Sequence, residues 1–85
     1  MKIKLFTKTN CPKCPLAKAL CDSLTGQCPI EYFNVDDRDG LAEASFYTVM
    51  STPSIIIVKD EHEVKGFRGE VPKKEEILAV LKNGN

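Results

Sequence analysis

The segment from Ser54 to Val58 constrains the fold more than any other part of this sequence. It reads SIIIV, a nearly continuous run of branched apolar residues. A strand with one face in water alternates polar and apolar residues, whereas a strand covered on both faces is apolar along its whole length. We therefore expect residues 54–58 to form the central strand of a sheet that is packed on both faces.

Three further strands and three helices are expected around this central strand. Period-two patterns and branched or aromatic residues predict the strands at Lys2–Lys8, Ile30–Val35 and Val64–Phe67. The expected helices run from Pro12 to about Gly26, from Leu41 to about Tyr47, and over the C-terminal segment that carries Ile77, Leu78, Val80 and Leu81.

This order, βαβαββα, predicts an α/β fold of three layers with a four-stranded mixed sheet flanked by three helices. A right-handed crossover makes the first two strands parallel, and the short turn at residues 60–62 makes the last two antiparallel. We expect a single domain over residues 1–85. In its first strand, Ile3 and Leu5 define a buried face. Lys2, Lys4 and Lys8 alternate on the other face, where Phe6 is the exception, and we expect that face to be partly covered.

Charge and composition argue against two classes of function. Twelve basic and twelve acidic side chains cancel, so the sequence has no basic region typical of binding to nucleic acid or a membrane surface. The N-terminal segment alternates charged and apolar residues and lacks the apolar core of a signal peptide. We therefore expect a monomeric protein of the cytoplasm, where four cysteines favour redox chemistry or metal binding over structural disulfides.

Two of the cysteines, Cys11 and Cys14, lie in the segment TNCPKC between the first strand and the first helix. Their spacing suits a reversible disulfide, half of a metal site, or a buried pair without chemistry. Pro12 fits the first helical position, so Cys11 is expected at the helix N-cap and Cys14 in the first turn. Backbone N–H groups and the helix dipole then favour a thiolate at Cys11, and Lys13 and Lys8 add positive charge.

Two alternatives use the remaining thiols. With Cys21 and Cys28 the spacing becomes C-x2-C-x6-C-x6-C, a set that could bind zinc or an iron–sulfur cluster if the helix broke near Cys21. Cys21 shares an apolar helical stripe with Leu20 and Leu24, so its simpler interpretation is a buried packing residue. A regulatory Cys21–Cys28 disulfide stays open, as does an interaction module whose Cys11 and Cys14 are vestigial.

Two segments resemble a known family. KTNCPKC, between a strand and a helix, resembles the corresponding region of glutaredoxins, and DGLAEASFYTVMSTPSIIIVKD is similar to the helix, cis-proline turn and central strand of thioredoxins. The chain thus resembles the thioredoxin-fold dithiol oxidoreductases, more narrowly the glutaredoxin-like small redoxins. The resemblance implies that Cys11 is the nucleophile and Cys14 the resolving cysteine. It also implies that Pro53 is a cis-proline facing them and that Thr52 offers its backbone to the substrate.

The same resemblance implies a reaction and its partners. The protein would reduce protein or small-molecule disulfides through a reversible Cys11–Cys14 bond, without a bound cofactor or metal, and Pro12, Lys13 and Lys8 would complete the substrate-binding residues. Where glutathione-binding glutaredoxins carry paired glycines, this chain has GFRGEVPKK, which is similar to thioredoxin or to small redoxins that serve ribonucleotide reductase. Glutathione or a thioredoxin-reductase-like flavoprotein would supply the electrons.

Overall fold

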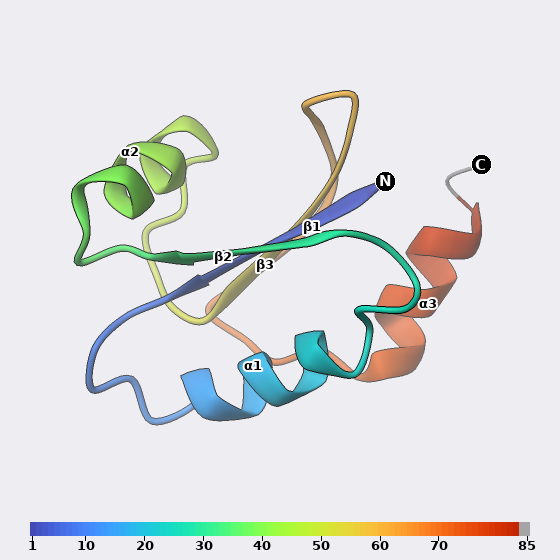
Figure 1. The fold of residues 1–85 in the computed structure, drawn as a ribbon, viewed down its shortest axis with the longest axis horizontal. Helices are drawn as coiled ribbons and strands as arrows, with labels where there is room; N and C mark the ends of the chain where they lie inside the picture. The colour runs from blue at the N-terminus through green and yellow to red at the C-terminus, as the bar shows by residue number, and fades with distance from the viewer. Residues whose placement is uncertain (84–85) are drawn as a thin grey trace.

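The computed structural model describes residues 1–83 as a four-stranded sheet with three helices (Figure 1). The elements are β1 (Lys2–Thr7), α1 (Cys14–Asp22), β2 (Ile30–Asn34), α2 (Arg38–Phe46), β3 (Ser54–Lys59), β4 (His62–Arg68) and α3 (Lys74–Asn83). The strand order is β2-β1-β3-β4, with β1 parallel to β2 and antiparallel to β3, and β4 antiparallel to β3. The expected element order and mixed sheet are confirmed.

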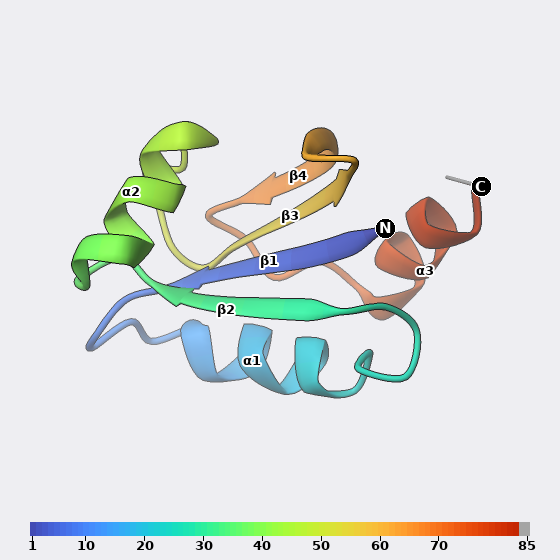
Figure 2. The ribbon, with the colours of Figure 1, turned by 45° about the horizontal axis from the view of Figure 1, so that its top comes forward.

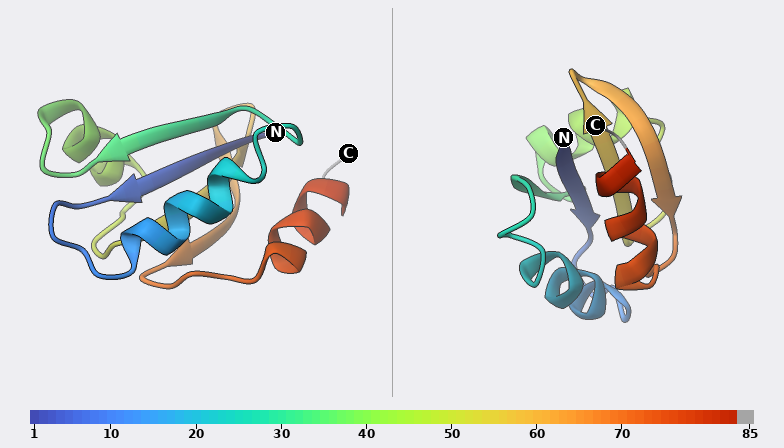
Figure 3. Two further views of the ribbon diagram at one scale, coloured as in Figure 1. Left: turned by 60° about the horizontal axis from the view of Figure 1, so that its bottom comes forward. Right: turned by 90° about the vertical axis from the view of Figure 1, so that its right-hand side faces the viewer.

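The helices cover both faces of the sheet and give the expected three layers. α2 lies on one face, and α1 and α3 lie on the other (Figures 2 and 3). Ile55 and Ile57 pack in the core under α1 and α3, whereas Ile56 and Val58 pack in the core under α2. The SIIIV run is therefore apolar because β3 contributes side chains to both cores. None of the helices within residues 1–83 has the length and apolarity to cross a membrane.

Helix α2 begins earlier than the sequence indicated. It starts at Arg38 rather than Leu41, because Asp37 adopts an extended conformation at the N-cap and its carbonyl accepts the Leu41 N–H at 2.8 Å. Helix α1 ends at Asp22, four residues before the expected stop at Gly26. The chain between them continues as turns rather than as helix, since the Leu24 N–H donates to the Cys21 carbonyl at 2.9 Å.

The second face of β1, expected to be partly covered, is buried at Lys4 and Phe6. The side chain of Lys4 lies on the face covered by α2, and the residue is only 4% exposed. Its ammonium forms ion pairs with Glu43 of α2 and Glu31 of β2, and it lies 5.3 Å from the centroid of the Phe33 ring. Burial, the largest single influence, would lower the pKa of Lys4, but the hydrogen bonds to Glu43 and Glu31 and the negative charges of these carboxylates together raise it. Lys4 therefore stays charged and ties α2 to the sheet.

Three connecting segments meet at one edge of the sheet. Ser54 at the start of β3 pairs with Phe6 near the end of β1 and with Arg68 at the end of β4. The segment after β1, the segment before β3 and the segment after β4 therefore leave the sheet side by side. The cysteine pair lies in the first of these segments, so this edge carries the candidate site.

Candidate active site

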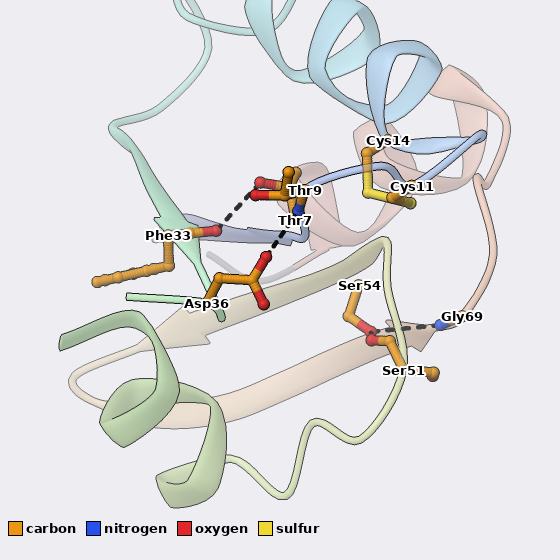
Figure 4. Close-up of a disulfide and its surroundings, with 9 residues drawn as sticks. All are labelled: Thr7, Thr9, Cys11, Cys14, Phe33, Asp36, Ser51, Ser54 and Gly69. Carbon is orange, nitrogen blue, oxygen red and sulfur yellow. Dashed lines mark hydrogen bonds between the residues drawn. A yellow bond between two sulfur atoms is a disulfide. The ribbon is translucent and has the colours of Figure 1, made fainter. Parts of the chain in front are cut away.

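Cys11 and Cys14 form a disulfide at the N-terminal end of α1 (Figure 4). Their Cα atoms are 5.3 Å apart. Cys14 is the first residue of α1 and is buried, whereas Cys11 lies in the turn before the helix and is half-buried. An incoming disulfide can therefore reach the sulfur of Cys11 more easily than that of Cys14.

The expected N-cap position of Cys11 is wrong. Helix α1 begins at Cys14 with Lys13 as its N-cap, and Pro12 lies in the preceding turn. The Cys14 N–H donates to the Cys11 carbonyl at 3.3 Å. A helix beginning at Pro12 would need a backbone donor from Pro15 to that same carbonyl, which proline lacks. Starting at Cys14 places Pro15 in the first turn, where helices leave backbone N–H groups unpaired in any case.

A cavity of about 400 Å³ opens beside the two sulfurs. Both cysteines line it, together with Lys8 and Lys18. Lys8 was expected near the dithiol, whereas Lys18 was not among the predicted site residues. The sequence signal for Lys18 is its spacing, since a residue four positions after Cys14 lies one helical turn further along the same side of α1.

Hydrogen bonds from β2 and the segment after it hold the chain before Cys11 in place. The carboxylate of Asp36 accepts the Thr9 N–H at 3.0 Å, and the Thr7 hydroxyl donates to the Phe33 carbonyl at 3.3 Å (Figure 4). The bond from Thr9 holds the pKa of Asp36 below its ordinary value, so this carboxylate stays ionised. Thr9 and Asp36 are 27 positions apart, so no local pattern in the sequence indicated this contact.

The turn before β3 lies at the same end of the sheet as the segment that carries the dithiol. The Thr52–Pro53 bond is cis, as the resemblance implies. The Pro53 carbonyl accepts the Gly69 N–H at 2.9 Å, and the Ser54 hydroxyl donates to the Ser51 carbonyl at 2.7 Å. Gly69 also donates to the Ser54 hydroxyl (Figure 4). The turn that carries Thr52 and Pro53 is therefore fastened to the ends of β3 and β4.

A second cavity of about 480 Å³ adjoins Thr52. Lys8 lines this cavity as well as the one that holds the sulfurs, so the two are neighbours. Leu41 and Met50 lie on its rim and are 57% and 91% exposed. Leu41 and Met50 therefore leave exposed apolar surface at this cavity.

The other two cysteines lie elsewhere and are free thiols. Cys21 is fully buried in the core beneath α1, and Cys28 is half-buried in the segment before β2. Within residues 1–83, no group of three or more Cys, His, Asp or Glu side chains is arranged to hold a metal ion. The four-cysteine metal site is not favoured, because Cys14 and Cys21 lie at opposite ends of α1.

We expect Cys21 and Cys28 to react slowly in the folded protein. Burial raises the pKa of Cys21 to about 12 and also raises that of Cys28. With the Cys11–Cys14 bond intact, iodoacetamide should alkylate Cys21 roughly a thousandfold more slowly than in the unfolded chain, because a pKa of about 12 removes that much thiolate. Mass spectrometry would count the labels with and without guanidinium chloride, and equal rates in both would contradict the burial of these thiols.

The site and its sheet together define a class of protein. Two cysteines whose backbones already lie within disulfide range can gain and lose their bond without rebuilding the fold. A cis-proline turn lies at the same end of the sheet, before β3. A dithiol at the N-terminal end of a helix, beside a mixed four-stranded sheet, is the arrangement of thiol–disulfide oxidoreductases with the thioredoxin fold.

Comparisons with known proteins narrow this class to a family. A family model described as a thioredoxin domain matches residues 1–82. A thioredoxin of Methanocaldococcus jannaschii is 34% identical over 86 residues, which cover 96% of this chain and 93% of that protein. The chain belongs to the thioredoxin family.

Solved thioredoxin structures share the fold across nearly the whole chain. Thioredoxin 1 from Thermosipho africanus superposes with a TM-score of 0.82 at 21% identity, covering 99% of this chain and 93% of that one. A mutant thioredoxin from Halobacterium salinarum gives a TM-score of 0.84 at 18% identity, covering 96% of this chain and 72% of that one. At sequence identities of 21% and 18%, the similarity to these two structures shows a shared fold.

Proposed function

We propose that this thioredoxin-family protein reduces disulfides of proteins and small molecules by cycling the Cys11–Cys14 bond. The observation that carries the proposal is the unequal exposure of the two disulfide-bonded cysteines, since Cys11 is half-buried and Cys14 is buried at the start of α1. In the reduced protein the Cys11 thiolate attacks one sulfur of the substrate, and the other leaves as a thiolate. Cys14 then attacks Cys11 in the mixed disulfide and releases the second substrate thiol. Two electrons and two protons pass to the substrate, and the Cys11–Cys14 bond reforms.

Residues around the sulfurs would support this cycle without a bound cofactor or metal. The positive end of α1 begins at Cys14, and Lys8 and Lys13 add positive charge, so negative charge on the dithiol is favoured. Thr52 would offer its backbone to an extended substrate segment next to Pro53, and Pro12 would lie under the same segment. The apolar cavity beside Thr52 would receive a neighbouring side chain of the substrate.

The proposal extends to the setting in which the protein works. The balanced charge and the family resemblance support a cytoplasmic monomer of one domain, without nucleic-acid or membrane partners. Its partners would be disulfide-containing proteins and an electron-donating reductase. Ribonucleotide reductase is one candidate acceptor, on the resemblance of GFRGEVPKK to the small redoxins that serve it.

A thioredoxin-reductase-like flavoprotein is the electron donor we propose in preference to glutathione. In a glutathione site the segment after β4 would have to bind a carboxylate, but the Gly69 N–H already donates to Pro53 and Ser54. Glu70 then adds a negative charge to this exposed segment. Both features disfavour an anionic tripeptide at this edge of the site.

We therefore expect the oxidised protein to be reduced at least about tenfold faster by NADPH with a thioredoxin reductase than by glutathione at matched reducing potential. NADPH oxidation, coupled in the second case through glutathione reductase, would measure both rates. Omission of the protein gives the background for each assay. Faster reduction by glutathione would overturn the choice of donor while leaving the dithiol cycle in place.

A further inference from the structure

Glu63 and Arg68 lie on the same face of β4, although they are five positions apart. In a regular strand, residues an odd number of positions apart point to opposite faces. The pairing of β4 with β3 passes from Lys65 directly to Glu63 and skips Val64, so the strand has a bulge. Glu63 pairs with Val58, whose side chain lies in the core under α2. The bulge thus turns Glu63 toward the face that α2 covers.

On that face the guanidinium of Arg68 makes three hydrogen bonds. Two go to the carboxylate of Glu63, from Nη1 at 2.9 Å and from Nη2 at 2.6 Å. The third runs from Nη2 to the Tyr47 carbonyl at 2.7 Å. A two-pronged pair with a carboxylate fixes the plane of a guanidinium, so Glu63 aims Arg68 at Tyr47.

Gly66 has no side chain, and the ion pair of Glu63 and Arg68 occupies the space that a side chain at this position would fill. A Cβ on Gly66 would lie 2.2 Å from Nη1 of Arg68 and 2.7 Å from Oε2 of Glu63. The clash involves the ends of two flexible side chains rather than backbone. An alanine at this position would therefore displace the Arg68 guanidinium and leave the strand itself in place.

Tyr47 is the first residue of the segment that leads to the cis-proline turn. Helix α2 ends at Phe46, and Thr48 has a φ of +56°, so the chain turns sharply directly after Tyr47. Arg68 holds the start of this segment at Tyr47. The next residue of the chain, Gly69, holds its end at Pro53. Both ends of residues 47–53 are therefore fixed by consecutive residues at one end of β4.

We propose that Glu63, Gly66 and Arg68 form a unit that positions residues 47–53 for substrate binding, with Arg68 as the positioning residue. The inference rests on the proposed function, since it takes Thr52 and Pro53 as contacts of the substrate. Arg68 acts through the Tyr47 carbonyl and not on the sulfurs. A segment that is not held in its binding conformation must be ordered by the substrate, and this cost weakens binding of an extended polypeptide. A small disulfide that needs only the sulfurs is spared this cost.

The test compares Gly66→Ala and Arg68→Ala with the control Lys65→Ala, which removes a cation from the opposite face of the same strand. With insulin as substrate and dithiothreitol as reductant, we expect KM to rise about fivefold in both test variants while kcat stays within about twofold. Lys65→Ala should match the wild type. The rate with dithiobis(nitrobenzoate) and the pH profile of Cys11 alkylation should be unchanged in all three, and all assays are run well below each variant's melting temperature.

The variant Arg68→Lys tests an intermediate effect on KM. Lysine keeps one donor for the Tyr47 carbonyl but cannot form the two-pronged pair, so its KM for insulin should lie between those of the wild type and Arg68→Ala. A wild-type KM in an active, folded Gly66→Ala variant would overturn the inference. So would an equal loss with insulin and with the small disulfide. These outcomes differ from a failure of the proposed function, because in that case the wild type itself would not reduce insulin.

Discussion

Replacing Cys11 by serine should lower the rate of insulin reduction by about a thousandfold or more, because a serine hydroxyl cannot open a disulfide as a thiolate does. Cys14 cannot take over the attack readily, since its side chain is buried at the start of α1. Insulin turbidity with dithiothreitol as reductant measures the rate. The matched control is Cys28→Ser, the same change at a half-buried thiol outside the site, which should stay within about twofold of the wild type.

Replacing Cys14 by serine separates the two roles. Cys11 can still attack a substrate disulfide, but without Cys14 the mixed disulfide is not resolved and should accumulate. A non-reducing gel and intact mass would show one substrate joined to one protein molecule. Trapping by Cys11→Ser instead would reverse the roles of the two cysteines. Full activity in Cys11→Ser would contradict the dithiol cycle, and a wild type that binds disulfide proteins without reducing them would favour the interaction module.

Local sequence patterns predicted the architecture because the architecture depends on local periodicity. The apolar run at residues 54–58 required a strand covered on both faces, and the order of the other elements left one plausible sheet. The place of Cys11 and Cys14 followed in the same way, since both fall between a strand and a helix. Pro53 needed the family resemblance, because an isolated X-Pro bond is cis in only about 5–6% of cases.

The first turn of α1 shows where local reasoning was incomplete. Pro12 and Pro15 each suit the start of a helix, and the sequence interpretation chose the first one. A helix from Pro12 would contain Pro15 where a donor to the Cys11 carbonyl is required. Applying the missing N–H of Pro15 as a strict condition would have excluded a start at Pro12 and moved it to Lys13 or later.

Lys4 and Arg68 could not have been placed from the sequence. The partner of Lys4 on α2, Glu43, is 39 positions away, and alternation alone assigns any lysine of a strand to solvent. The Glu63–Arg68 pair depends on a bulge at Val64, and skipping one residue reverses the face of all that follow. These side chains are set by register and by helix packing, which emerge only when distant segments meet.

Gly40→Ala should destabilise the protein by about 2 kcal/mol, although alanine is the better helix former. Gly40 lies in the first turn of α2 where the helix crosses the end of β2. A Cβ there would lie 1.9 Å from the carbonyl oxygen of Asn34 and 2.6 Å from its carbonyl carbon. These are backbone atoms, so a rotamer change cannot relieve the contact. Either α2 or the end of β2 must move.

The control is Gly26→Ala, where an added Cβ would meet no described atom within 4 Å. Its stability should equal that of the wild type or exceed it by up to about 1 kcal/mol, because alanine restricts the unfolded chain. Urea unfolding followed by circular dichroism gives both free energies of unfolding. A displaced Asn34 would also disturb Asp36, whose N–H donates to the Asn34 side chain at 2.8 Å and whose carboxylate holds Thr9 beside the dithiol. Gly40→Ala as stable as Gly26→Ala would mean that α2 can shift freely, and the close contact would then place no constraint on the site.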